Sequence, residues 1–265
     1  MVGSGRVSMA LVMLMLMQAA VAGAVICTST APTFASLFTH EDFGTYQRVN
    51  STQCGESYIL YPRDGTRPNL GSSYKYFGVP LQGVAVTQTP PVAYLEAVGA
   101  RSKIKVSSQY TTSSCVAKMV GDGDTESFVS SSTDATLHAQ QMADADIEAI
   151  ISDPYNTGQW SDAASRPKVI CAASTYEPTP MGGAEWVKFW GYFFSNGAAA
   201  SDSFCATGAR YSCNSLSASS INKAASVMGS DSYSYQVLAP AGTPQPAQLE
   251  PYTPTRKLTQ AWTCA

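Results

Sequence analysis

The chain has 265 residues, a formal net charge of −3 and an isoelectric point near 5.4. Charged residues make up 13% of it, about half of the usual globular share, and Ser, Thr, Ala and Gly take their place. With few cations and no Lys/Arg cluster, the composition gives no support for a nucleic-acid partner or a lipid-headgroup site.

Residues 1–24 predict a signal peptide. Arg6 precedes an apolar run over 9–17 and a small-residue stretch over 19–24, which match the three regions of such a leader. The apolar run is shorter than the roughly 20 residues that a membrane-spanning helix needs. Cleavage after Ala22 or after Ala24 fits equally well. We therefore expect a secreted, cell-surface or, in a bacterium, periplasmic protein.

Seven cysteines in an exported chain predict disulfides. Cys205 and Cys213 are close enough in sequence for a local loop, but the spacings do not choose among the possible pairings. A lipid anchor on Cys27 is the alternative for that residue, although the bulky Ile26 before it suits a lipoprotein signal poorly. Residues 50–52, Asn-Ser-Thr, form one glycosylation acceptor, which matters only in a eukaryotic compartment and indicates a surface position.

The elements are predicted in four stretches after the signal peptide is set aside. Residues 25–76 are expected to form a loop-rich leader, because prolines and glycines interrupt everything except the strand-like Ser57–Tyr61. An α/β lobe is expected over 77–197. It begins with a strand at Gly83–Val86, a helix at Val92–Val98 and a strand at Ile104–Val106. This β-α-β order predicts a parallel sheet.

The remaining elements of the lobe and those of the C-terminal part are predicted from the same kinds of pattern. A helix is predicted over 134–151, a buried strand over 168–173 and an amphipathic helix over 184–194. The last helix carries an aromatic stripe typical of a core element: Trp186, Phe189, Trp190, Phe193 and Phe194. A long helix is expected over 198–230, and a short strand with a proline-rich tail over 231–265.

The chain lacks the common signatures of catalytic and metal sites. His40 and His138 are too few and too isolated for a histidine-rich zinc or copper site. The acidic turn around Gly121–Gly123 lacks the remaining ligands of a calcium loop, so a solvated turn is expected there. No C-x-x-C pair supports a thiol oxidoreductase, and no hydrolase or nucleotide-binding motif occurs. The sequence gives no support for an enzyme.

Several segments, taken in chain order, resemble motifs of one known family. They are the Thr-Gln-Thr-Pro turn at 87–90 with the helix 94–100, the strand end 106–110, and the segments 146–154 and 180–191. The series is similar to the N-terminal lobe of the helical-backbone (class III periplasmic) substrate-binding proteins of ABC importers. The most specific segment is 180–191, which looks like the family's "P-L-G-x-A-E-W-I-K-F-L" helix. The resemblance covers roughly residues 83–238.

The resemblance implies a non-catalytic binding protein without a cofactor, whose ligand is an iron-siderophore, cobalamin or a similar metal chelate. Carried over position by position, it implies ligand-facing residues at strand ends, where open parallel sheets bind their ligands. These residues are Thr87, Gln88, Thr89, Tyr110, Tyr176 and Glu177. Glu148 matches the acidic residue that docks against a membrane permease in the family. A surface helix carboxylate with no partner explains Glu148 equally well.

The chain also departs from the family. After the long helix the family has a whole second α/β lobe, whereas the proline-rich remainder here is too short to build one. Either the cleft is incomplete or the chain is a shortened copy. The cysteine content points to a divergent version on a eukaryotic secretory route. The alternative function is therefore a disulfide-supported secreted structural or interaction protein, a single lobe that has lost ligand binding.

Overall fold

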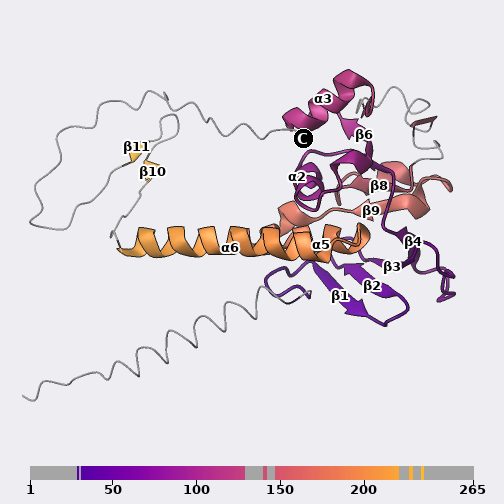
Figure 1. Ribbon diagram of the computed structural model, residues 1–265, viewed down its shortest axis with the longest axis horizontal. Helices are drawn as coiled ribbons and strands as arrows, with labels where there is room; N and C mark the ends of the chain where they lie inside the picture. Colours follow the sequence, from indigo (N-terminus) through magenta and orange to yellow (C-terminus); the bar gives the residue numbers. More distant parts are fainter. Residues whose placement is uncertain are drawn as a thin grey trace, which may run out of the picture. The chain divides into compact units, whose positions relative to one another are not determined.

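The computed structural model describes residues 29, 31–128, 140–141, 147–220, 227–228 and 234–235 (Figure 1). For residues 212–220, 227–228 and 234–235 it describes the backbone alone. The chain divides into two compact units, Met1–Thr207 and Gly208–Ala265. The first unit is an α/β structure with two sheets and contains every residue discussed below as part of a site.

The first sheet has the strand order β1-β2-β3-β4. Its strands are β1 (Phe38–Asp42), β2 (Gln47–Ser51), β3 (Glu56–Pro62) and β4 (Lys75–Val79). The first three strands pair antiparallel as consecutive hairpins, and β4 pairs parallel to β3. A loop-rich leader over 25–76 was therefore a wrong prediction, apart from the strand at Ser57–Tyr61, which β3 confirms.

Turn glycines explain why the sequence looked irregular in this region. Gly44 and Gly55 have φ values of 79° and 63°, and they lie in the turns between β1 and β2 and between β2 and β3. A positive φ is readily available only to glycine, so both residues close hairpins rather than interrupt structure. The two glycines that suggested an irregular loop are therefore turn residues between three antiparallel strands.

The second sheet is entirely parallel and has the order β7-β6-β5-β8-β9. Its strands are β5 (Val84–Val86), β6 (Ile104–Ser108), β7 (Glu126–Phe128), β8 (Ala149–Ser152) and β9 (Val169–Cys171). The helices α2 (Pro90–Ala97) and α3 (Ser114–Asp122) form the crossovers between the first three strands. The predicted β-α-β unit and parallel sheet are confirmed.

Short 3-10 helices join the remaining elements of this sheet. They lie at Arg101–Lys103, Thr157–Trp160, Arg166–Lys168 and Ser174–Tyr176. Helix α3 ends at Asp122, and the next residue, Gly123, has the left-handed conformation expected at a helix terminus. The predicted turn at Gly121–Gly123 is therefore confirmed only at Gly123, because Gly121 and Asp122 belong to α3.

The predicted helix over 134–151 is wrong at its C-terminal end. Residues 140–141 are helical, but 149–152 form β8, an interior strand of the second sheet. Residues 134–139 and 142–146 lie outside the described part. Ala149, Ile150, Ile151 and Ser152 are all fully buried. A strand covered on both faces is continuously apolar, and such a run also satisfies helical spacing over a short window.

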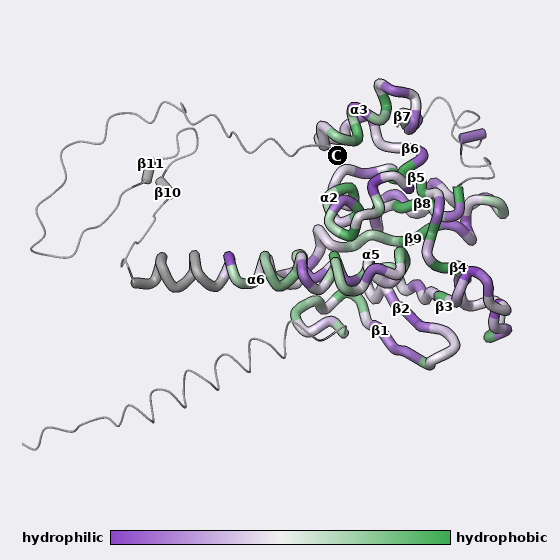
Figure 2. The backbone as a smooth tube through the Cα atoms, viewed as in Figure 1, coloured by the Kyte–Doolittle hydropathy of each residue, from purple (hydrophilic) through white to green (hydrophobic). Residues whose placement is uncertain are grey.

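Helix α5 (Pro180–Phe193) lies between the two sheets in the core and confirms the predicted aromatic stripe. Trp186, Phe189, Trp190 and Phe193 are fully buried, and Phe194 is only 8% exposed. They belong to one hydrophobic cluster with apolar residues of both sheets and of α2. In Figure 2 the hydrophobic colour is strong at β8 and β9, whereas the β1–β2 hairpin is mostly hydrophilic.

Ring contacts from α5 reach the first sheet directly. Trp186 meets Phe38 of β1 edge to face at 5.1 Å between ring centroids, and Phe193 meets Tyr58 of β3 at 5.6 Å. On the second sheet, Val84, Val86 and Ile151 belong to the same cluster. Because one helix supplies the apolar surface for both sheets, the two sheets share a core.

A disulfide also links the two sheets. Cys54, in the turn between β2 and β3, is bonded to Cys171 at the end of β9. Close by, the amide of Cys171 donates to the hydroxyl of Tyr58 at 2.8 Å. Cys115 and Cys205 are disulfide-bonded as well. These bonds bear out the prediction of a disulfide-supported fold.

The C-terminal part contains helix α6 (Gly197–Ser220) and two short antiparallel strands, β10 (Val227–Met228) and β11 (Ser234–Tyr235). The long helix was predicted to reach 230, so its predicted end was wrong because β10 begins before it. Strand β11 lies within the expected strand, and the rest of the expected tail is outside the described residues. In the part of the chain that the structure describes, no helix is long and apolar enough to cross a membrane.

Candidate functional site

The second sheet reverses its winding direction between β5 and β8. From β5 the chain proceeds to β6 and β7 on one side, and β8 and β9 then lie on the other side. A crevice forms beyond the carboxyl ends of the strands at such a switch point, and open α/β sheets bind ligands there. We call the segments that follow β5, β6, β8 and β9 the carboxyl edge: residues 87–91, 109–113, 153–157 and 172–180.

The predicted residues of the first segment lie at the switch point itself. Thr87 is nearly buried and joins the two neighbouring strands, because its amide and its hydroxyl both donate to the carbonyl of Ile151, at 3.1 and 2.9 Å. Gln88 and Thr89 are partly exposed. Thr89 precedes α2 without forming a side-chain cap. Thr87 thus joins β5 to β8 at the switch point, and the next two side chains are the ones that are partly exposed there.

Tyr110 stands at the tip of a tight turn after β6. The amide of Thr111 donates to the carbonyl of Ser108 at 3.0 Å, and the hydroxyls of Ser107 and Thr111 are 2.7 Å apart. The turn leaves the Tyr110 side chain 67% exposed. A tyrosine held outward by a hydrogen-bonded turn exposes a large apolar ring with one polar end, which suits ligand contact.

Tyr155 occupies the same kind of position after β8, and the sequence analysis missed it. The amide of Asn156 donates to both the carbonyl and the carboxylate of Asp153, at 3.2 and 2.6 Å. This turn leaves Tyr155 86% exposed. The wrongly predicted helix over 134–151 hid the strand end that precedes it. The Ser-Asp-Pro-Tyr-Asn turn signal directly after a buried apolar run was the pattern that could have revealed it.

Tyr176 is the third exposed tyrosine of the carboxyl edge. It ends the 3-10 helix after β9, with its amide donating to the carbonyl of Ala173 at 3.0 Å, and its side chain is 47% exposed. Tyrosines therefore follow three of the four strands that form this edge. Adjacent strands are about 4.8 Å apart, so the segments from β6 to β9 span about 14 Å, comparable to a small-molecule chelate.

Glu177 was predicted to face a ligand, but its carboxylate is engaged within the protein. It accepts from the amides of Ser36 and Leu37, both through Oε1 at 3.1 and 2.9 Å, and from the indole of Trp186 at 2.9 Å. A carboxylate with three such donors has little capacity left for a ligand. Its role in the structure is to hold the segment that leads into β1.

Glu185 holds the preceding part of that segment. Its carboxylate oxygen Oε2 accepts from the consecutive amides of Thr33, Phe34 and Ala35 at 2.8, 2.5 and 2.8 Å. The same carboxylate pairs with the ammonium of Lys188 at 2.8 Å, and both side chains are almost completely buried. Residues 33–37, called the N-terminal strap below, thus have all five amides bound by two carboxylates.

Glu148 lies at the opposite end of the second sheet from the carboxyl edge. It directly precedes β8 in an extended segment, not on a surface helix as predicted. Its carboxylate pairs with Arg63 at 2.5 Å and accepts from the amide of Gln82 at 2.9 Å. The description of this residue as a surface helix carboxylate was therefore wrong about the helix, and its contacts within the chain link the two sheets.

The carboxyl edge is polar but carries no cation. Its four segments contain no lysine or arginine and many hydroxyl side chains. Its two acidic residues, Asp153 and Glu177, both accept hydrogen bonds from the protein. The polar groups of this edge are therefore tyrosines, hydroxyls, side-chain amides and these two hydrogen-bonded carboxylates.

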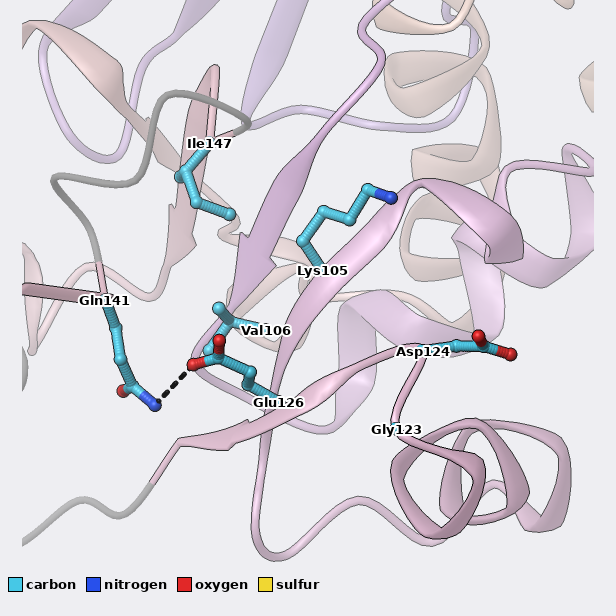
Figure 3. A pocket seen from close by; sticks show the side chains of 7 residues that line it. All are labelled: Lys105, Val106, Gly123, Asp124, Glu126, Gln141 and Ile147. Atoms are coloured by element: carbon cyan, nitrogen blue, oxygen red, sulfur yellow. Dashed lines mark hydrogen bonds between the residues drawn. The ribbon is translucent and has the colours of Figure 1, made fainter.

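A hollow of about 220 Å³ lies elsewhere on the same sheet (Figure 3). It is lined by Lys105, Val106, Gly123, Asp124, Glu126, Gln141 and Ile147, near the amino ends of β7 and β8. Gln141 donates to the carboxylate of Glu126 at 3.1 Å across it. Ligand pockets are usually larger, about 300–1,000 Å³, and lie at the other end of a parallel sheet.

Two further observations concern the site. Among the residues that the structure describes, no three His, Cys, Asp or Glu side chains converge in a group able to hold a metal ion. Comparisons with protein-family models, curated proteins and solved structures found nothing that matches the chain. The functional argument therefore depends on the geometry of the carboxyl edge.

Proposed function

We propose that the protein is an extracytoplasmic, non-catalytic binding protein for a metal chelate of the iron-siderophore or cobalamin type. The observation that carries the proposal is the set of three exposed tyrosines, Tyr110, Tyr155 and Tyr176, at turn tips along one edge of a parallel sheet. Gln88 and Thr89 lie between them, after β5. Aromatic faces with nearby hydroxyl and amide groups suit a bulky ligand that is mostly apolar with polar edges.

The localisation belongs to the same proposal. The predicted leader over 1–24 and the disulfide between Cys54 and Cys171 both suit an oxidising compartment. The resemblance of segments 87–110 and 180–191 to substrate-binding proteins of ABC importers supports a role in ligand capture for transport. Docking of Glu148 on a permease remains a prediction, and any such partner would have to meet a carboxylate that already pairs with Arg63.

The charge of the carboxyl edge suggests which chelates bind. An anionic ligand loses hydration on binding and meets no lysine or arginine in the four segments to compensate for that loss. A neutral ligand avoids this cost. We expect a neutral ferric trihydroxamate or cyanocobalamin to bind at least about tenfold more tightly than a trianionic ferric tris-catecholate, a difference of about 1.4 kcal/mol.

Calorimetric titration of the purified protein with these three compounds tests both statements. Saturable binding of a neutral chelate supports the proposed function. Tighter binding of the catecholate contradicts the charge argument alone. If none of the three compounds binds, ligand capture of this type is wrong, and the alternative of a secreted structural or interaction protein is favoured.

Replacing Tyr110 and Tyr155 together by alanine is expected to weaken binding of the neutral chelate at least about tenfold, because exposed aromatic side chains supply most of the contact surface. The matched control is Phe43→Ala. Phe43 is 46% exposed, close to the 47% of Tyr176, but it lies in the β1–β2 turn of the other sheet. Equal affinity of the double variant and the control would place the binding site away from the carboxyl edge.

A further inference from the structure

One motif of the sequence has no part in the proposed function. Residues 50–52, Asn-Ser-Thr, form the one N-glycosylation acceptor of the chain. Asn50 and Ser51 are the last two residues of β2, and Thr52 begins the turn toward β3. The motif lies in the first sheet, whereas the carboxyl edge belongs to the second. It can therefore be judged on its own geometry.

The strand alternation places Asn50 on the face opposite the core. Val49 and Ser51, its neighbours in β2, are 0% and 1% exposed, whereas Asn50 is partly exposed and Thr52 is exposed. Successive side chains of a strand point to opposite faces, so burial of both neighbours fixes Asn50 outward. The acceptor asparagine and its hydroxyl residue are both on the solvent side.

The residues across from Asn50 leave room above its side chain. The strand register pairs Asn50 with Thr39 on β1 and with Ser57 on β3, and both partners are small. The Asn50 Nδ2 donates to the hydroxyl of Thr39 at 2.8 Å. A side chain flanked by two small hydroxyl residues can extend into solvent without displacing a bulky neighbour.

We propose that Asn50 carries an N-linked glycan. The donor would be an oligosaccharide attached to a lipid diphosphate. Nδ2 forms a bond to the anomeric carbon of the first sugar, the bond from that carbon to the diphosphate oxygen breaks, and the lipid diphosphate leaves. One amide proton of Nδ2 is lost in this step. The remaining N–H still donates to Thr39, so the modified side chain keeps its place in the fold.

The glycan covers the row of small polar side chains formed by Thr39, Asn50 and Ser57 on the outer face of the first sheet. That face is then closed to protein partners. The carboxyl edge follows strands of the second sheet, so removal of the glycan is expected to leave ligand affinity unchanged. Glycosylation and ligand binding are thereby separable in experiment.

The test is secretion of the full chain, including residues 1–24, from a cultured eukaryotic cell, followed by peptide N-glycosidase treatment. The expected result is a mobility shift on treatment, with deamidation at residue 50 seen by peptide mass spectrometry. Asn50→Gln and Thr52→Ala are each expected to abolish the shift, whereas Thr52→Ser retains the acceptor and the shift.

The matched control is Asn69→Gln. Asn69 is an exposed asparagine followed by Leu70 and Gly71, which do not complete an acceptor, so the control keeps the shift. An unmodified residue 50 in wild-type chain recovered from the medium or from the secretory lumen overturns the proposal. Because the proposal is judged by the modification of residue 50 in the wild-type chain, a folding defect in a variant does not affect the conclusion.

Discussion

Replacing Glu185 with Gln is expected to lower the free energy of unfolding by about 3 kcal/mol, since breaking a buried ion pair typically costs about 3–5 kcal/mol. Glu185 is 0% exposed and Lys188 2% exposed. The substitution keeps the shape of the side chain but leaves the Lys188 ammonium without its counter-charge. The other contacts of that ammonium are a carbonyl, that of Ala31 at 3.3 Å, and the ring of Phe204 at 4.7 Å.

Urea denaturation of the wild type and the variant measures this loss. The control is Glu41→Gln, which removes the surface pair with Arg48 and is expected to cost less than about 1 kcal/mol. The double variant Glu185→Gln with Lys188→Met should recover part of the loss, because it removes the unpaired charge as well. Equal losses for Glu185→Gln and Glu41→Gln would show that the pair contributes no more than a surface interaction.

The same carboxylate predicts a pH dependence. Burial acts to raise the pKa of Glu185, but the hydrogen bonds from Lys188 and from the amides of the N-terminal strap outweigh it, so the pKa lies below its usual 4.5. A lowered pKa in the folded state means that the stabilisation is present above about pH 4.5 and is lost as the pH falls through the folded-state pKa. The stability difference between the wild type and Glu185→Gln should therefore shrink in acid.

Removing the disulfide by Cys54→Ala with Cys171→Ala is expected to lower the free energy of unfolding by about 2–5 kcal/mol. The two cysteines are separated by 117 positions, and the entropy that the bond removes from the unfolded chain grows with this separation. Alanine is the suitable replacement because Cys171 is fully buried, and a serine hydroxyl there would need a hydrogen-bond partner.

Denaturation of the two single variants and the double variant provides the internal control. Either single substitution already removes the bond, so all three proteins are expected to lose similar stability. Losses in the double variant that equal the sum of the two single losses would mean that the two sulfurs act separately as packing groups. That result would contradict a stabilising crosslink between the turn after β2 and the end of β9.

Local patterns predicted β5, α2, β6 and β9 of the second sheet, because these elements are short and strongly marked, but they missed β7 and β8. The strand at 83–86, the helix at 92–98 and the aromatic helix at 184–194 each carried a clear period or stop signal, and each extends only one residue beyond the observed element that it overlaps. The first sheet was missed, since its strands are separated by glycine turns and only Ser57–Tyr61 is apolar enough to stand out. Pairing between strands is a long-range property that a local window does not contain.

The candidate site was predicted in part for the same reason. The resemblance to substrate-binding proteins singled out Thr87 and Tyr110, which do follow β5 and β6, but the misplaced helix before β8 concealed Tyr155. Glu177 was placed correctly after β9, yet no local pattern indicated that the amides of residues 36–37 would occupy its carboxylate. Contacts between side chains about 140 positions apart depend on the tertiary fold, and charge or spacing in the sequence does not reveal them.

The bond between Cys54 and Cys171 also sets an order of events during synthesis. Cys54 emerges from the ribosome long before its partner, and Cys115 emerges in between. In the oxidising compartment proposed above for this protein, thiols are oxidised as they arrive, so the first bond that Cys54 can form is with a sulfur other than Cys171. Production of the native protein then depends on thiol-disulfide exchange after β9 has been made, and its yield from a cell is governed by isomerase capacity as much as by stability.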